Sequence, residues 1–188
     1  MKKFFALLLA ALLLTGCSSG LQEQITDTTG QPVQTTAEPT QTTAPVQEVR
    51  PTAPDFTVYD REGNEVKLSD FLGKPVVLNF WASWCGPCKS EMPHFQQAWE
   101  QYGDEVAFLM VNLTDGQGET AETAYSYIDG CCYTFPVYCD TTSEAAYTYG
   151  IYSIPTTFFI HADGTAEGYI SGAMDLETLE MAIGLIME

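Results

Sequence analysis

Two cysteines separated by two residues, Cys85 and Cys88, carry the clearest chemical signal in this sequence. In such a pair, one thiolate attacks a disulfide and the second thiol then attacks the mixed disulfide that results. The products are a reduced partner and an oxidised cysteine pair. The spacing therefore predicts thiol–disulfide exchange at these two positions.

The segments around the pair predict how it is positioned. The apolar, β-branched run over residues 76–81 precedes it and predicts a buried strand. Apolar residues then recur three or four positions apart, which predicts a helix from about Pro87 to Tyr102. The cysteines thus lie at a helix N-terminus, where free backbone N–H groups and the helix dipole stabilise a thiolate. We expect Cys85 to be the nucleophile, because a lowered thiol pKa makes it reactive near neutral pH.

Three other chemistries compete for the same cysteines. A zinc site needs further ligands at metal spacing, and the sequence has no second Cys-x-x-Cys or His pair, so we predict no metal site. A purely structural disulfide rarely combines a helix N-terminus with an exposed first sulfur. A cysteine hydrolase would need His94, further along the same helix, or His161, which precedes a hairpin turn where we expect an exposed side chain without a catalytic role. Redox chemistry is the prediction we favour.

Two motifs resemble those of a known family. Residues 84–88, Trp-Cys-Gly-Pro-Cys, match the active-site sequence of the thioredoxins, and Pro93 matches the proline of their following helix. Residues 153–157, Ser-Ile-Pro-Thr-Thr, resemble the segment with a cis proline that faces the cysteines in that family. Asn79 stands where cytoplasmic thioredoxins carry a buried aspartate. The run that begins at Asn79, together with Glu-Met-Pro at residues 91–93, is more similar to the extracytoplasmic, membrane-tethered TlpA/ResA-like branch.

The resemblance covers about residues 53–188 and implies the roles of the site residues. These are Cys85 as nucleophile, Cys88 as resolving thiol, Trp84 as an apolar neighbour, Glu91 as a group that tunes proton transfer, and Ile154 with Pro155 as the segment that pairs with the client backbone. Pro155 is expected to be cis, and the less favoured alternative is a trans proline that starts a strand. Trp84 could equally be an ordinary core aromatic residue. Because Asn79 cannot act as a base, Glu91 is the nearest candidate for that work. Glu91 could equally be a favourable acid in the first helical turn, with no catalytic part.

The N-terminus predicts export and anchoring. A charged start and the apolar run over residues 4–14, too short for a permanent membrane span, predict a signal peptide over residues 1–16. The run ends in Leu-Thr-Gly-Cys, which resembles a bacterial lipobox with Cys17 as the lipidated first residue of the mature protein; the alternative is an ordinary secretory signal with a chance cysteine. Residues 17–50 are then a Thr-, Gln- and Pro-rich linker with too few apolar residues to fold. We therefore expect an anchored domain on the extracytoplasmic face of a bacterial cell envelope.

Residues 51–188 predict an α/β thioredoxin fold, with a central mixed sheet flanked by helices and an N-terminal β-hairpin extension. The other predicted strands cover residues 56–59, 66–68, 106–112, 135–138, 156–160 and 166–170, and the other predicted helices cover residues 69–73, 121–128, 143–149 and 176–186. Hydrophobic residues make up 45% of the chain, enough for a core.

Charge excludes some partners. The formal net charge is −18, and no Lys or Arg follows Lys89. Nucleic-acid binding needs clustered cations, so we predict none. An acidic surface also disfavours docking onto anionic lipid.

These features predict a membrane-anchored oxidoreductase that reduces disulfides of exported proteins. The sequence contains no flavin, nicotinamide or metal motif, so no cofactor is expected. The resemblance implies a membrane thiol electron donor of the CcdA/DsbD-like kind, and clients such as apocytochrome c or methionine sulfoxide reductase. Alternatives are a disulfide-forming oxidase that uses the same cysteines at a higher potential, and a non-catalytic binding module on the same fold. A peroxidase of the peroxiredoxin type would need a Thr-x-x-Cys site, which Trp-Cys-Gly-Pro-Cys does not supply.

Three cysteines are left over: Cys131, Cys132 and Cys139. We expect Cys139 to form a structural bridge to Cys131 or Cys132, which would leave one thiol. A vicinal bridge between Cys131 and Cys132 is strained and less favourable. A second redox pair ranks below the structural bridge.

Overall fold

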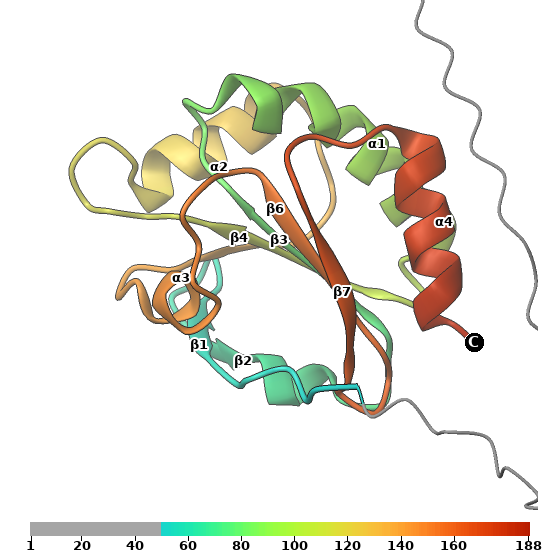
Figure 1. Ribbon diagram of the computed structural model, residues 1–188. Coiled ribbons are helices and arrows are strands. Elements are labelled where there is room, and N and C mark those ends of the chain that lie inside the picture. The colour runs from blue at the N-terminus through green and yellow to red at the C-terminus, as the bar shows by residue number, and fades with distance from the viewer. Residues whose placement is uncertain (1–49) are drawn as a thin grey trace, which may run out of the picture. The chain divides into compact units, whose positions relative to one another are not determined.

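The computed structural model describes residues 50–188, in which strands and helices alternate from β3 to β6 between two β-hairpins (Figure 1). The strands are β1 (Thr57–Tyr59), β2 (Glu65–Lys67), β3 (Val76–Trp81), β4 (Ala107–Asn112), β5 (Val137–Cys139), β6 (Thr156–Ile160) and β7 (Ala166–Ser171). The helices are the short 3-10 helix η1 (Leu68–Phe71), α1 (Gly86–Tyr102), α2 (Ala121–Gly130), α3 (Glu144–Thr148) and α4 (Leu176–Ile186). The predicted signal peptide, Cys17 and the predicted linker up to residue 49 lie outside the described residues.

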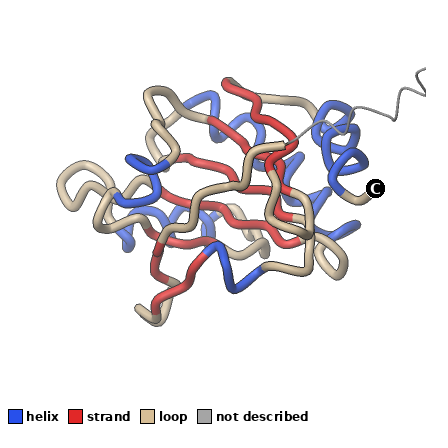
Figure 2. Tube along the Cα trace, turned by 60° about the horizontal axis from the view of Figure 1, so that its bottom comes forward, coloured by secondary structure: helices blue, strands red, loops and turns tan. Residues whose placement is uncertain are grey.

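Within residues 50–188 seven strands form one mixed sheet in the order β2-β1-β5-β4-β3-β6-β7. Figure 2 shows strands of this sheet side by side, in red. β3 lies between β4, with which it runs parallel, and β6, with which it runs antiparallel. All six residues of β3 are buried. A strand with a neighbour on each edge and helices over both faces has no exposed side, which explains its continuous apolar run.

The two faces of the sheet carry separate apolar clusters. Because side chains alternate along a strand, Val77 and Trp81 of β3 pack on the face covered by α1, α2 and α4, whereas Leu78 and Phe80 pack on the face covered by α3. Because β3 is packed on both faces, its C-terminal end has a fixed position, and so do the cysteines that follow it in the chain.

The strand predicted over residues 135–138 begins two residues later, as β5. Phe135 is buried and its ring stacks on Tyr133 with a centroid distance of 5.3 Å. Pro136 has no N–H with which to enter the ladder. The apolar pattern therefore includes buried residues that precede the strand as well as the strand itself.

Candidate active site

Cys85 and Cys88 form a disulfide at the N-terminus of α1, with their Cα atoms 5.3 Å apart. Cys85 is the N-cap residue, and its Sγ accepts a hydrogen bond from the backbone N–H of Cys88 at 3.1 Å. After reduction the same donor and the helix dipole would stabilise a thiolate on Cys85. Cys85 keeps 4% of its surface exposed whereas Cys88 keeps none, so an incoming sulfur meets Cys85 first.

A cis peptide bond joins Ile154 to Pro155, as the sequence predicts, and brings the backbone against the disulfide. The carbonyl oxygen of Ile154 lies 3.7 Å from Sγ of Cys85. This is a contact rather than a hydrogen bond, because the oxidised sulfur carries no hydrogen. The segment is held from behind, where the backbone N–H of Gly172 donates to the carbonyl of Pro155 at 2.8 Å.

Glu91 is fully buried three residues after Cys88 on α1. Its Oε1 accepts a hydrogen bond from Nδ2 of Asn79 at 3.0 Å, and its Oε2 accepts one from the backbone N–H of Met174 at 3.2 Å. Burial raises the pKa of this carboxyl to about 7, against a smaller lowering by the two hydrogen bonds. Glu91 can therefore exchange a proton near neutral pH, which an ordinary glutamate in water cannot do efficiently.

A second buried carboxylate, Glu119, holds the turn that leads to Cys85. Its two oxygens accept from the backbone N–H of Ser83 at 2.8 Å and from its hydroxyl at 2.7 Å. Nδ2 of Asn112 donates to the same carboxylate at 2.6 Å. Glu119 could not be predicted as a site residue, because nothing in the polar loop around it indicates burial. Its hydrogen bonds fix the position of Ser83.

Trp84 adjoins Cys85 and is 64% exposed, so it presents an apolar ring beside the entry to the disulfide. Ile154 is half-buried, and its carbonyl oxygen contacts the same sulfur.

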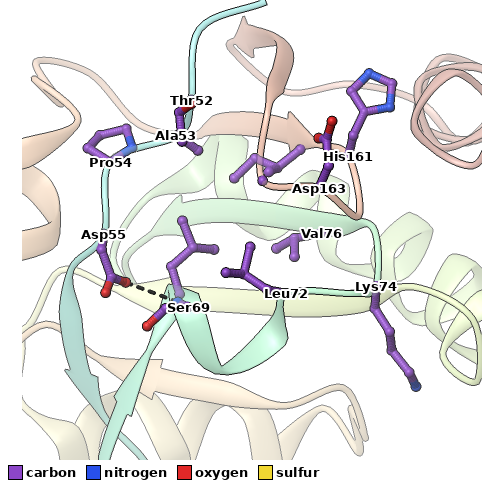
Figure 3. A pocket seen from close by; sticks show the side chains of 13 residues that line it. Thr52, Ala53, Pro54, Asp55, Ser69, Leu72, Lys74, Val76, His161 and Asp163 are labelled. Atoms are coloured by element: carbon purple, nitrogen blue, oxygen red, sulfur yellow. Dashed lines mark hydrogen bonds between the residues drawn. The ribbon is translucent and has the colours of Figure 1, made fainter.

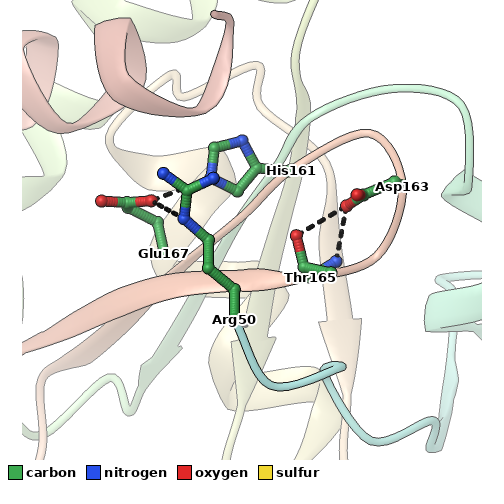
Figure 4. A network of polar contacts seen from close by, with 5 residues as sticks. All are labelled: Arg50, His161, Asp163, Thr165 and Glu167. Carbon is green, nitrogen blue, oxygen red and sulfur yellow. Dashed lines mark hydrogen bonds and ion pairs between the residues drawn. The ribbon is translucent and has the colours of Figure 1, made fainter. Parts of the chain in front are cut away.

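Within residues 50–188, neither histidine is hydrogen-bonded to Cys85 or Cys88. His94 contacts the carbonyl of Met174 through Nδ1 at 3.0 Å. His161 was expected to be exposed, but it is largely buried and its Nε2 lies 2.9 Å from Oε2 of Glu167 (Figure 4). Nε of Arg50 lies 2.8 Å from the same oxygen. The hairpin of β6 and β7 brings His161 and Glu167 side by side, which the turn motif alone does not reveal.

The predicted bridge from Cys139 is wrong: within residues 50–188, Cys131, Cys132 and Cys139 are free. Cys139 ends β5 and is buried, whereas Cys131 and Cys132 are exposed at the end of α2. There Cys132 takes a positive φ of 58° and its N–H donates to the carbonyl of Asp129, a left-handed helix ending that leaves both thiols in solvent.

A cavity of about 450 Å³ lies at the end of the sheet that is opposite to the cysteines (Figure 3). Val76 from the start of β3 and Ile160 from the end of β6 line it, whereas Cys85 follows the end of β3. Because a strand rises about 3.3 Å per residue, the length of β3 separates this cavity from Cys85. None of the residues that line this cavity is a cysteine, and we assign it no part in the exchange.

A mixed sheet, a cysteine pair at a helix N-terminus and a facing cis proline define a thioredoxin-fold thiol–disulfide oxidoreductase. The sequence model of the AhpC/TSA family matches residues 49–167. The relatives of this chain include the thiol-disulfide oxidoreductase ResA of Geobacillus thermodenitrificans. ResA is 37% identical to this chain over 130 residues, which are 69% of this chain and 72% of ResA. The chain belongs to the AhpC/TSA family, and within it the chain is a ResA-like enzyme.

Solved structures agree with this assignment. StoA from Bacillus subtilis is 30% identical, with a TM-score of 0.61 over 69% of this chain and 96% of StoA. The exposed lipoprotein thioredoxin of Streptococcus pneumoniae is also 30% identical, with a TM-score of 0.62 over 70% of this chain and 99% of its own.

The sequence also matches the prokaryotic membrane lipoprotein lipid attachment site over residues 1–18. Together with the ResA-like relatives, this makes the chain a membrane-anchored protein of the cell envelope. Among the helices of residues 50–188, none has the length and apolar character needed to cross a membrane.

Proposed function

We propose that this protein reduces disulfides in exported client proteins. The observation that carries the proposal is the approach of Cys85 Sγ to the carbonyl oxygen of Ile154, at 3.7 Å. A client strand that pairs with the backbone beside Pro155 would bring its own sulfur to Cys85. The reducing direction is supported by Gly86 and Pro87 between the cysteines, the dipeptide that thioredoxins carry.

The reaction consists of two exchanges. The Cys85 thiolate attacks one sulfur of the client disulfide, forms a mixed disulfide and expels the other client sulfur as a thiolate. The Cys88 thiol then loses its proton and its sulfur attacks Sγ of Cys85, which releases the second client sulfur. The client gains two electrons and, once its thiolates take up two protons, becomes a dithiol. Cys85 and Cys88 are left as the disulfide seen in the structure.

Glu91 supplies the proton acceptor for the second exchange. Cys88 is buried, so water cannot readily take its proton. A carboxyl with a pKa of about 7 is poised to accept a proton at neutral pH and to return it later. Asn79 holds the carboxyl in place but has no titratable group of its own.

Membrane anchoring would come from lipidation of Cys17, the cysteine of the attachment motif. The oxidised pair must be reduced again after each cycle, and a membrane thiol carrier of the CcdA/DsbD-like kind is the proposed electron donor. Proposed clients include apocytochrome c and methionine sulfoxide reductase, because TlpA/ResA-like proteins serve such clients.

Replacement of the resolving thiol tests the proposal. In Cys88→Ser the second exchange is blocked, so client proteins should accumulate as mixed disulfides on Cys85 in the cell envelope. Mass spectrometry after release with dithiothreitol identifies the clients. The variant with Cys85→Ser and Cys88→Ser together is the control for adducts on the exposed Cys131 and Cys132, and the clients trapped on Cys85 should be absent from it. Absence of releasable adducts from Cys88→Ser would contradict the exchange mechanism.

A further inference from the structure

The segment before the cis proline carries a fully exposed aromatic ring. Tyr152 is 99% exposed and lies two residues before Ile154, whose carbonyl faces the disulfide. Single exposed apolar residues are common, so exposure alone says little. The position of Tyr152 is more informative, because it lines a cavity together with Ser153 and Thr156, the two residues on either side of Ile154 and Pro155 in the chain.

This cavity, of about 340 Å³, lies between the segment that follows α3 and the paired strands β6 and β7. Its lining consists of Tyr149, Gly150, Ile151, Tyr152, Ser153, Thr156, Phe158, Tyr169 and Ser171. None of these residues is charged, although the chain as a whole carries a formal charge of −18. The cavity therefore suits an uncharged occupant.

The aromatic lining is held in place by its own contacts. The ring of Phe158 stacks on that of Tyr169 with a centroid distance of 5.2 Å, and Tyr149 meets Phe158 edge-on at 4.8 Å. The hydroxyl of Tyr149 donates to the carbonyl of Pro54 at 3.0 Å. A ring that enters the cavity would meet aromatic surfaces already fixed in position, which lowers the ordering cost of binding.

Hydroxyl groups join the cavity to the cis-proline segment. The Oγ atoms of Ser153 and Ser171 lie 3.1 Å apart, and Oγ1 of Thr156 donates to the carbonyl of Ser153 at 2.9 Å. Ser153 and Thr156 flank Ile154 and Pro155 directly, and Ser171 pairs with Thr156 across the sheet. The cavity is thus continuous with the surface on which we propose that the client backbone pairs.

We propose that this cavity binds an aromatic side chain of the client, located within two residues of the client cysteine that reacts with Cys85. The proposal rests on the proposed function and names a substrate preference for it. Tyr152 and Ser153, which line the cavity, immediately precede Ile154, so a client residue within two positions of the one opposite Ile154 would be close enough to reach the cavity. Aromatic contacts of this kind favour a Tyr over a Ser by about three- to tenfold.

The test uses two peptides, each closed by a disulfide, that differ only in carrying Tyr or Ser two residues from one cysteine. The reduced protein is mixed with each peptide, and oxidation of Cys85 and Cys88 is followed by acid quenching and mass spectrometry. The proposal predicts that the wild-type protein reacts about three- to tenfold faster with the Tyr peptide. Tyr152→Ser should lower this ratio to about one, and Tyr152→Phe should keep it.

Tyr147→Ser is the matched control. Tyr147 is 89% exposed on α3 but does not line the cavity, so its replacement should leave the wild-type ratio unchanged. Equal rates with both peptides in the wild-type protein, or a preference that survives Tyr152→Ser, would overturn the proposal while leaving the reductase function intact. No reaction with either peptide would contradict the proposed function itself and remove the basis for the preference.

Discussion

The side-chain amide of Asn79 donates to Oε1 of Glu91 across 3.0 Å in the interior beneath the cysteines. Nδ2 of Asn79 also donates to Oγ1 of Thr157 at 2.9 Å, so the amide ties β3 to both α1 and β6. Asn79 stands where cytoplasmic thioredoxins carry an aspartate, and its side chain is a neutral hydrogen-bond donor. The titratable group lies on α1 instead, at Glu91.

Glu91→Gln should remove a pH-dependent cost of folding. The carboxyl has a pKa of about 7 in the folded protein and an ordinary value of 4.5 when unfolded, so the folded state binds more protons between these values. The stability that the protonated carboxyl provides is complete below pH 4.5 and is lost as pH rises through 7. At 1.36 kcal/mol per unit, the loss amounts to about 3 kcal/mol.

Urea unfolding of both oxidised proteins at pH 5 and pH 8 measures this effect. The free energy of unfolding of Glu91→Gln should rise relative to wild type as pH increases, because the neutral amide carries no such cost. Other titrating groups cancel in the difference. A difference that stays constant between the two pH values would show that Glu91 is not buried with a raised pKa.

Reduced Cys85 should be the reactive thiol. Its sulfur accepts the N–H of Cys88 at the start of a 17-residue helix, which favours the thiolate. In Cys88→Ser, iodoacetamide should modify Cys85 with a midpoint between about pH 3.5 and 7.5, below the value of about 8.5 for a free cysteine. Cys85→Ser should leave Cys88 slow to react, because that thiol is buried. A midpoint for Cys85 at or above about 8.5 would contradict the role of the helix terminus.

Glu119→Ala should destabilise the protein by about 3 kcal/mol, because the donors of Ser83 and Asn112 lose their acceptor in a buried place. Glu119→Gln should cost less, since its amide oxygen keeps one acceptor. Urea unfolding measures both, with Glu62→Ala at an exposed position expected within about 0.5 kcal/mol of wild type. Equal stability of Glu119→Ala and Glu62→Ala would mean that the network does not hold the turn.

Thiol titration should separate the remaining cysteines. In the oxidised protein with Cys17→Ala, a thiol reagent should find two reactive groups, Cys131 and Cys132, because both are exposed. The thiol of Cys139 should react only in denaturant, which raises the total to three. A single thiol in denaturant would instead indicate the structural bridge that this fold lacks.

Much of the fold follows from local pattern. The runs over residues 76–81 and 106–112 are buried throughout because both strands are central and covered on both faces, and their largely apolar pattern predicts their bounds to within one residue. The start of β5 could not be read in the same way, since Phe135 packs as an apolar residue without joining the ladder. Periodicity reports burial, and a backbone pairing needs a free N–H as well.

The residues of the site also fall into two groups, those that a local motif predicts and those that depend on contacts between distant parts of the chain. Cys85, Cys88 and the cis Pro155 follow from short motifs whose local geometry is fixed. The contact between Ser83 and Glu119 joins residues 36 positions apart and depends on how the loop after β4 closes. The free state of Cys139 likewise depends on the way α2 ends, which no cysteine count can provide.

The midpoint potential of the Cys85 and Cys88 pair decides whether the pair acts as a reductant. The measurement uses a soluble form that lacks residues 1–17, with Cys131, Cys132 and Cys139 replaced by alanine, so that a single couple equilibrates with a thiol buffer. A reductant should show a value at or below about −230 mV, in the range of cytosolic reductants. A value near about −120 mV would make the protein a disulfide-forming oxidant and would reverse the proposed direction of electron flow.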